Sequence, residues 1–165
     1  MELKEAFNLL EGTVLDIKDE HVHKDPGGKS TPAGAAYAHI IVSADSVING
    51  MILHKPFLLE TKMNGKGGFD LAYPPYDEAQ LAVWLKKVKV DMAQLKSYEK
   101  EIRTFCEEYV SGLTDDDLDK KIEVQGMGEM TIAYLLGTFL IGHINNHCGE
   151  ISAVKGLHGT KGYPF

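Results

Sequence analysis

The sequence predicts an all-α fold, an antiparallel four-helix bundle with two long connections, and three observations lead to this prediction. Apolar residues recur every three to four positions in four long segments, the period of a helix that is buried on one face. Proline and glycine gather between these segments, where they interrupt helices. Alternating apolar and polar residues, typical of strands, are not evident, and the chain has no internal repeat.

The first half of the chain is expected to form two helices. Residues 2–23 carry apolar side chains at helical spacing, among them Leu3, Phe7, Leu10, Val14 and Ile17. The sequence DPGGKSTP at 25–32 then interrupts the helix. The second helix is expected from about Pro32, because proline suits a first helical turn, to near His54.

The second half is expected to form the other two helices. Asp77 opens the third helix and Gly112 ends it, with an apolar stripe that includes Trp84 and Ile102. The fourth helix is expected from about Glu129 to Val154 or Lys155, with Gly156 as its C-cap.

Two long connections complete the predicted bundle. Residues 55–76 hold three prolines, three glycines and the apolar piece FLLETKM, which has room for one helical turn. In the second connection, 112–128, Thr114 is expected to cap a short helix, and residues 120–128 to form an irregular or extended link. Either connection could fold over one end of the bundle, and residues 1–165 are expected to form a single domain.

Composition excludes several classes of protein. The chain has 165 residues, 17 of them basic and 24 acidic, and its net charge of −7 argues against nucleic acid or an anionic membrane as partner. Cys106 and Cys148 both fall inside predicted helices and form no disulfide framework. The charged N-terminus does not resemble a signal peptide, and the apolar stretches fall short of the ~20 residues of a membrane helix. A cytoplasmic protein is therefore expected.

His143 and His147 are the most informative residues of the fourth helix. Steps of four from Phe139 reach His143, His147 and Ile151, so both imidazoles are expected along the buried stripe, one turn apart. Two histidines at this spacing can bind one metal ion from a single helix face. The alternative is a pair of core histidines whose nitrogens are satisfied by hydrogen bonds.

A useful metal site needs a third ligand from another helix, and His39 is the best candidate. It lies in the first half of the second helix beside small residues that leave room for a ligand. However, the strongest apolar face of this helix runs through Ile40, Ile41 and Ile48, and His39 falls well off that face. From this pattern alone, His39 is as readily a surface histidine as a ligand.

Glu150 is the candidate catalytic residue. It follows His147 by three positions and therefore lies on the same side of the helix. It could be a fourth ligand, an acceptor for an imidazole N–H, or a general base. The alternative is a surface carboxylate near Lys155.

Three segments of the chain resemble the DinB-like superfamily, which includes bacillithiol S-transferases and mycothiol-dependent maleylpyruvate isomerase. They are the C-terminal stretch TIAYLLGTFLIGHINNHCGEISAVKGLHG with its H-x-x-x-H, the segment LTDDDL at 113–118, and AAYAHIIVSADSV in the second helix. The resemblance implies a four-helix bundle in which His39, His143 and His147 bind a divalent metal ion, which could be zinc, nickel or iron.

The resemblance also implies a function and an assembly. It suggests a metal-dependent enzyme that transfers a low-molecular-weight thiol to a small-molecule electrophile. Two alternatives remain: a metal-dependent hydrolase, with Glu150 as one candidate base, or a non-catalytic, stress-associated metal-binding bundle whose site Glu150 closes as fourth ligand. A homodimer is expected because family members are often dimeric and because one small bundle has many aromatic side chains to bury, namely Trp84, Tyr98, Tyr109 and Tyr134.

Overall fold

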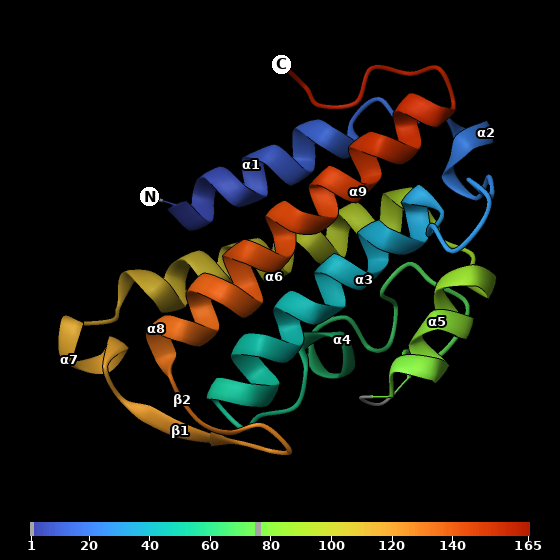
Figure 1. Cartoon of the computed structure of the whole chain (residues 1–165). Helices are drawn as coiled ribbons and strands as arrows, with labels where there is room; N and C mark the ends of the chain where they lie inside the picture. Colours follow the sequence, from blue (N-terminus) through green and yellow to red (C-terminus); the bar gives the residue numbers. More distant parts are fainter. Residues whose placement is uncertain (1, 75–76) are drawn as a thin grey trace.

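The computed structural model describes residues 2–74 and 77–165, which fold into a helical bundle (Figure 1). The strands are β1 (Lys121–Val124) and β2 (Gly128–Thr131). The helices are α1 (Glu2–Val14), α2 (Asp19–Val22), α3 (Ala33–Asp45), α4 (Leu58–Thr61), α5 (Glu78–Lys87), α6 (Met92–Ser111), α7 (Asp115–Leu118), α8 (Ile132–Tyr134) and α9 (His143–Leu157), with the π-helical segments η1 (Ser46–Ile52) and η2 (Leu135–Gly142).

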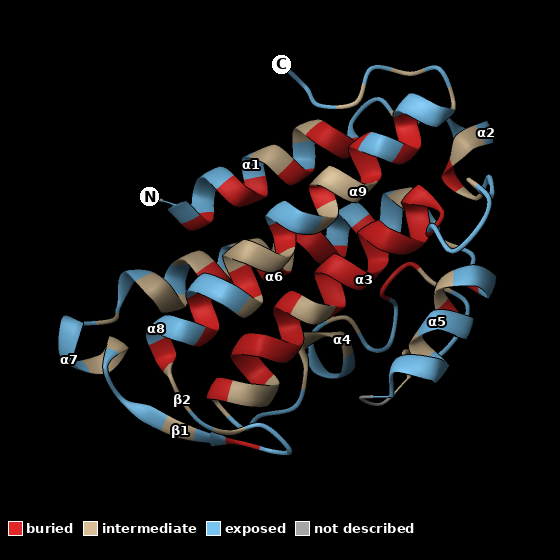
Figure 2. Cartoon of the chain, in the orientation of Figure 1, coloured by how far each residue is buried: buried red, intermediate tan, exposed pale blue. Residues whose placement is uncertain are grey.

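The long helices α1, α3, α6 and α9 form a four-helix bundle, as predicted. Each of α1 and α3 packs against both α6 and α9, so the four surround one core. Segment η1 continues α3, and α8 and η2 lead directly into α9 (Figure 1). Figure 2 shows buried residues concentrated on the inner faces of these helices and along the whole of α3.

Helix direction explains why the first connection is long. Figure 1 shows α1 and α9 running one way and α3 and α6 the other, so α3–α9 and α1–α6 are the antiparallel neighbours. Consistent with this, Asn8 in the middle of α1 bonds Arg103 of α6 at 2.7 Å, while Leu15, just after α1, shares a hollow with Lys96 near the start of α6. Because α3 and α6 are parallel, the chain between them returns along the side of the bundle instead of closing over its end.

Helix α3 is buried on nearly every side. From Ala33 to Asp45 all residues except Ser43 are buried. Within the described residues, Ala33–Ile52 is also the one helix long and apolar enough to span a membrane, and 83% of its apolar window is buried inside the bundle. Its apolar character is thus explained by its position at the centre of the fold.

The first and third predicted helices are shorter than expected. The first ends at Val14, where the amide of Ile17 bonds the carbonyl of Val14 at 3.3 Å and the carbonyl of Thr13 accepts a 2.8 Å hydrogen bond from the buried Lys155. The third divides into α5 and α6, because the side chain of Asp91 accepts from the amide of Gln94 at 3.1 Å and starts a new helix. The apolar stripe continued through this break because both helices pack against the core.

The expectation of no strands is corrected by a short hairpin, in which the first part of the link expected to be irregular or extended is an extended strand. Strands β1 and β2 pair antiparallel, with Lys121 opposite Thr131 and Val124 opposite Gly128. Gly126 adopts a positive φ of 80° in the turn, a conformation that glycine adopts without strain. Four residues per strand are too few for alternation to be recognised, and the hairpin moves the start of the fourth helix from Glu129 to Ile132.

The other expectations for the connections and aromatic residues have mixed outcomes. The single helical turn expected in 55–76 is α4, and the short helix capped by Thr114 is α7. The expectation of a dimer rests in part on aromatic side chains that one bundle would leave exposed. This argument is wrong for Trp84 and Tyr98, which are 5% and 0% exposed. Tyr134 is 51% exposed, so it alone of the four is largely accessible.

The buried carboxylate of Asp45 fixes the first connection to α3. Its Oδ1 accepts from the amide of Leu58 at 3.0 Å and its Oδ2 from the amide of Leu59 at 3.0 Å, which are free donors at the start of α4. Asn49 also donates to Oδ1 at 2.8 Å, and the hydroxyl of Tyr98 donates to Oδ2. These bonds position α4 beside the face of α3 that carries the histidine described next.

Candidate metal site

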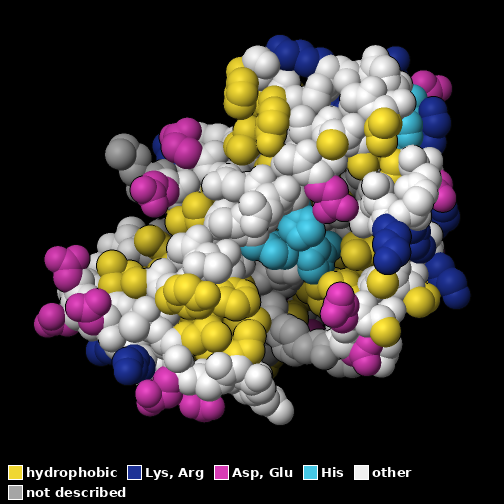
Figure 3. Space-filling model, viewed as in Figure 1, with side chains coloured by type: hydrophobic (Ala, Val, Ile, Leu, Met, Phe, Trp, Pro, Cys, Tyr) yellow, Lys and Arg dark blue, Asp and Glu magenta, His cyan; other side chains and the backbone are white. Residues whose placement is uncertain are grey.

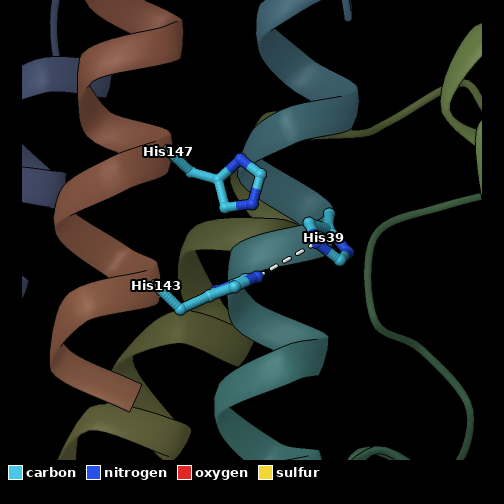
Figure 4. Close-up of side chains that lie close together, drawn as sticks. All are labelled: His39, His143 and His147. Carbon is cyan, nitrogen blue, oxygen red and sulfur yellow. Dashed lines mark hydrogen bonds between the residues drawn. The ribbon is translucent and has the colours of Figure 1, made fainter. Parts of the chain in front are cut away.

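Three imidazoles from two helices converge between α3 and α9 (Figure 4). His39 lies on α3, and His143 and His147 lie one turn apart at the start of α9. The distance from Nε2 of His39 to Nε2 of His143 is 3.1 Å, and one ring nitrogen of each histidine lies within 4.8 Å of the other two. The structure therefore brings together the three histidines that the sequence singled out.

The two histidines of α9 lie beside the core stripe rather than within it. The buried row of this helix is Leu140, Ile144 and Cys148, each 0% exposed, whereas His143 and His147 are half-buried on the neighbouring row. The expectation that they point along the buried stripe is corrected in this respect. The π-helical segment η2 precedes them and shifts the helical register. Counting in steps of four from Phe139 therefore gives the wrong direction for the two side chains. One side of the pair consequently faces solvent (Figure 3).

His39 is buried, with 8% of its surface exposed, so the alternative of a surface histidine is wrong. Its position off the strongest apolar face is the reason that it meets α9. Because α3 packs against α6 with one face and against α9 with another, a residue off the first face can still be buried by the second.

The environment keeps two of the imidazoles neutral. The pKa of His39 is lowered to about 4, mainly by burial and in part by the neighbouring His147. Burial lowers the pKa of His143 to about 3, with contributions from His147 and His39. At neutral pH both rings are therefore uncharged and each has one nitrogen with a free lone pair, which is the form that binds metal.

Glu150 lies behind His147. The Nδ1–H of His147 donates to Oε2 of Glu150 at 2.7 Å, and this bond lowers the pKa of the carboxyl group, which Thr31 lowers further. Donation from Nδ1 leaves Nε2 of His147 as the nitrogen with the lone pair. In this position Glu150 orients an imidazole; its predicted role as a catalytic base stays a prediction.

Tyr73 holds His39 in the same way, and sequence reasoning missed it. Its hydroxyl lies 2.7 Å from Nδ1 of His39, and Oγ of Ser43 lies 3.4 Å from the same nitrogen. The second ring nitrogen, Nε2, is thereby turned toward His143. Tyr73 belongs to the returning connection, where no periodic pattern indicates which side chain will meet α3; only the length of that connection was a signal.

The arrangement fits a single divalent ion. Two nitrogens at about 2.0–2.1 Å from a tetrahedral ion lie about 3.3 Å apart, close to the 3.1 Å between His39 and His143. The three rings are inclined to one another at 63–84°, so their edges rather than their faces meet. Supporting bonds from Glu150 and Tyr73 to the outer nitrogens are typical of imidazoles that bind a metal. Three protein ligands would leave a position for a small molecule.

The family model described as the DinB superfamily matches residues 2–151. No curated protein matches the chain.

Two solved structures have the same fold. A conserved protein from Enterococcus faecalis has a TM-score of 0.79 and 18% identity, over 94% of this chain and 92% of its own. YfiT from Bacillus subtilis, described as a probable metal-dependent hydrolase with an unusual four-helix bundle topology, has a TM-score of 0.65 and 18% identity, over 97% of this chain and 85% of its own. At this identity the likeness establishes the fold alone.

Proposed function

Because the chain belongs to the DinB superfamily, we propose that it is a metal-dependent enzyme in which His39, His143 and His147 bind one divalent ion and a small molecule reacts beside them. One observation carries this proposal. The three imidazoles converge, and their hydrogen bonds or ring orientations turn a lone pair of each toward the others. Imidazole ligands suit zinc, nickel and iron equally, so the donor set does not choose among them.

Hydrolysis is the first reaction that we propose. A divalent ion held by neutral imidazoles lowers the pKa of a water or thiol that it binds and so supplies a nucleophile at neutral pH. The description of YfiT as a metal-dependent hydrolase supports this choice for a chain of the same fold. The buried walls of α3 and α9 fix the three rings, and the half-buried position of His147 leaves the site open to solvent.

Transfer of a low-molecular-weight thiol to an electrophile is the second candidate, and the position of Glu150 favours it. Its carboxylate is occupied by His147 and Thr31, so it is poorly placed to remove a proton from water. A thiolate is a nucleophile without further help from a base. The chain's own thiols are unsuitable, because burial raises the pKa of Cys148 to about 12 and that of Cys106 above its usual value.

An activity screen tests the proposal and separates the two reactions. Protein reconstituted with zinc, nickel or iron would be assayed on esters, amides and phosphoesters without thiol, and on electrophiles with several low-molecular-weight thiols. We expect turnover in one class that a chelator abolishes and the metal restores. Bound metal without turnover in either class would contradict an enzymatic function and favour the non-catalytic bundle.

We predict that Glu150 positions His147. Glu150→Ala should lower metal affinity about 10–100-fold, as loss of such a partner does, whereas Glu150→Gln keeps an acceptor for Nδ1–H and should retain most of the affinity. The measurement is competition with a chromogenic chelator. If Glu150→Gln keeps its metal but loses hydrolysis, Glu150 is instead the general base.

We also propose a homodimer, which agrees with the expectation from the family. The exposed side chain of Tyr134 and its ring contact with Phe139 at 5.9 Å provide an apolar surface near η2. Sedimentation of the protein and of Tyr134→Glu tests this proposal: a dimer is expected for the first and a monomer for the second.

A further inference from the structure

A cavity of about 620 Å³ lies between α3 and the returning first connection. Its volume suits a small organic molecule. Its lining residues come from α3, η1, α4 with its N-cap Phe57, and the segment 65–74, and they include Val42, Ser46, Phe57, Leu59, Phe69 and Tyr73. None of the expectations from the sequence assigned a role to this cavity.

The cavity lies next to His39 and is connected to it through Tyr73, although none of the three histidines is among its described lining residues. Val42 and Ser46 follow His39 by three and seven residues, so all three lie on one face of the helix and the cavity begins about one turn beyond the imidazole. Tyr73 is a wall of the cavity and at the same time bonds Nδ1 of His39 at 2.7 Å. A molecule in the cavity would thus contact the residue that holds a proposed metal ligand.

The lining is apolar and aromatic, and its charged groups are acidic. Glu60 and Asp70 are the ionisable carboxylates among the lining residues, and the described lining contains neither lysine nor arginine. Carboxylates attract a cation and repel an anion, and aromatic faces favour the same sign of charge. The apolar walls supply the larger part of any binding energy.

The walls are fixed before any ligand binds. Asp45 holds the amides of Leu58 and Leu59 at 3.0 Å each, which positions α4. Oδ1 of Asp70 accepts from the amide of Lys89 at 2.8 Å, which attaches the far side of the cavity to the α5–α6 junction. A preformed cavity binds without a large ordering cost.

We propose that this cavity is the substrate-binding site and that the substrate is a largely apolar molecule with a neutral or positively charged group. This inference rests on the proposed function, because it assigns the substrate of the metal site. Tyr73 joins the two: its ring contacts the bound molecule and its hydroxyl positions His39. It is a positioning residue, not a catalytic one.

The first test measures binding without turnover. Phenethylamine, phenethyl alcohol and phenylacetate share a phenyl group and differ in charge, and each would be titrated into ¹⁵N-labelled protein with amide shifts as readout. We expect the amine and the alcohol to shift amides of residues 57–73, and the acid to bind about fivefold more weakly than the amine. Equal binding of the acid and the amine, or shifts elsewhere, would overturn the proposal.

Matched variants locate the ligand and its charge preference. Leu59 lines the cavity and not the neighbouring hollow of about 660 Å³, so Leu59→Trp should block the cavity. Ala79→Trp fills that neighbouring hollow, which does not include Glu60 or Asp70, and should leave binding unchanged. Glu60→Lys should remove the preference for the amine, and Glu108→Lys, an exposed change of equal charge on α6, should not. Loss of binding in Ala79→Trp but not in Leu59→Trp would place the ligand in the neighbouring hollow and overturn the proposal.

The coupling to the metal site has a separate readout. In cobalt(II)-loaded protein, phenethylamine should change the visible absorption spectrum, and Tyr73→Phe should abolish this change while amide shifts show that binding persists. A spectrum that the amine leaves unchanged in the parent protein would overturn the assignment as substrate site. Failure to bind cobalt at all would contradict the proposed function instead, while the amide titrations would still report on the cavity.

Discussion

Alanine at His39, His143 or His147 is expected to abolish stable metal binding. The unsubstituted protein should hold about one divalent ion per chain, because the three imidazoles converge on one point. Loss of a residue that only supports a ligand lowers metal affinity by up to roughly 100-fold, so loss of a ligand itself should lower it by more. Elemental mass spectrometry of untagged protein, purified without chelator, measures the metal directly.

The three variants also discriminate among arrangements of the site. His54→Asn is the matched control, because His54 is exposed and its positive φ of 51° is tolerated by asparagine. Loss of metal only in His143→Ala and His147→Ala would exclude His39 and make Glu150 a candidate ligand again. An unsubstituted protein that takes up no zinc, nickel or iron would leave the histidines as residues paired by hydrogen bonds, and the non-enzymatic function would follow.

Asp45→Asn is expected to cause the largest loss of stability, about 2–4 kcal/mol in the free energy of unfolding. The buried carboxylate accepts from Asn49, Leu58, Leu59 and Tyr98. An amide of the same shape offers one oxygen for these four donors, and its NH₂ group faces the others. Buried donors left without acceptors are costly because they have also lost water.

Urea unfolding measures this loss, and amide hydrogen exchange locates it. The amides of Leu58 and Leu59 should exchange faster in Asp45→Asn, because their acceptor is weakened. Asp119→Asn, an exposed change of the same kind, should alter stability by less than about 0.5 kcal/mol. A loss below about 1 kcal/mol in Asp45→Asn would indicate that α4 is held mainly by its apolar contacts instead.

Sequence and structure agree most closely where a local pattern is long. The four long helices follow from repeated apolar spacing over many residues, and the breakers between them follow from proline and glycine. Sequence patterns predicted the wrong structure where they were short, or where one pattern continued across a break between two helices. The hairpin of β1 and β2 has too few residues to show alternation, and the apolar stripe through Trp84 and Ile102 crosses the junction at Asp91 because both helices face the same core.

The sequence by itself determined the bundle and the pair of histidines in α9. The spacing of His143 and His147 is a local property, since any helix places residues four apart on one face. Their half-buried position was decided by η2 and by packing against α3, which no periodicity of α9 encodes.

Only the tertiary structure decided the rest of the site. Whether His39 was a surface residue depended on a second helix covering a second face of α3. Its partner Tyr73 is distant in sequence, and so is Thr31, which bonds the Glu150 that holds His147. The cavity beside Tyr73 exists because α3 and α6 run in parallel, which forces the connection between them back along the bundle. Helix direction is set by how four apolar faces pack together, and a single helix carries no information about it.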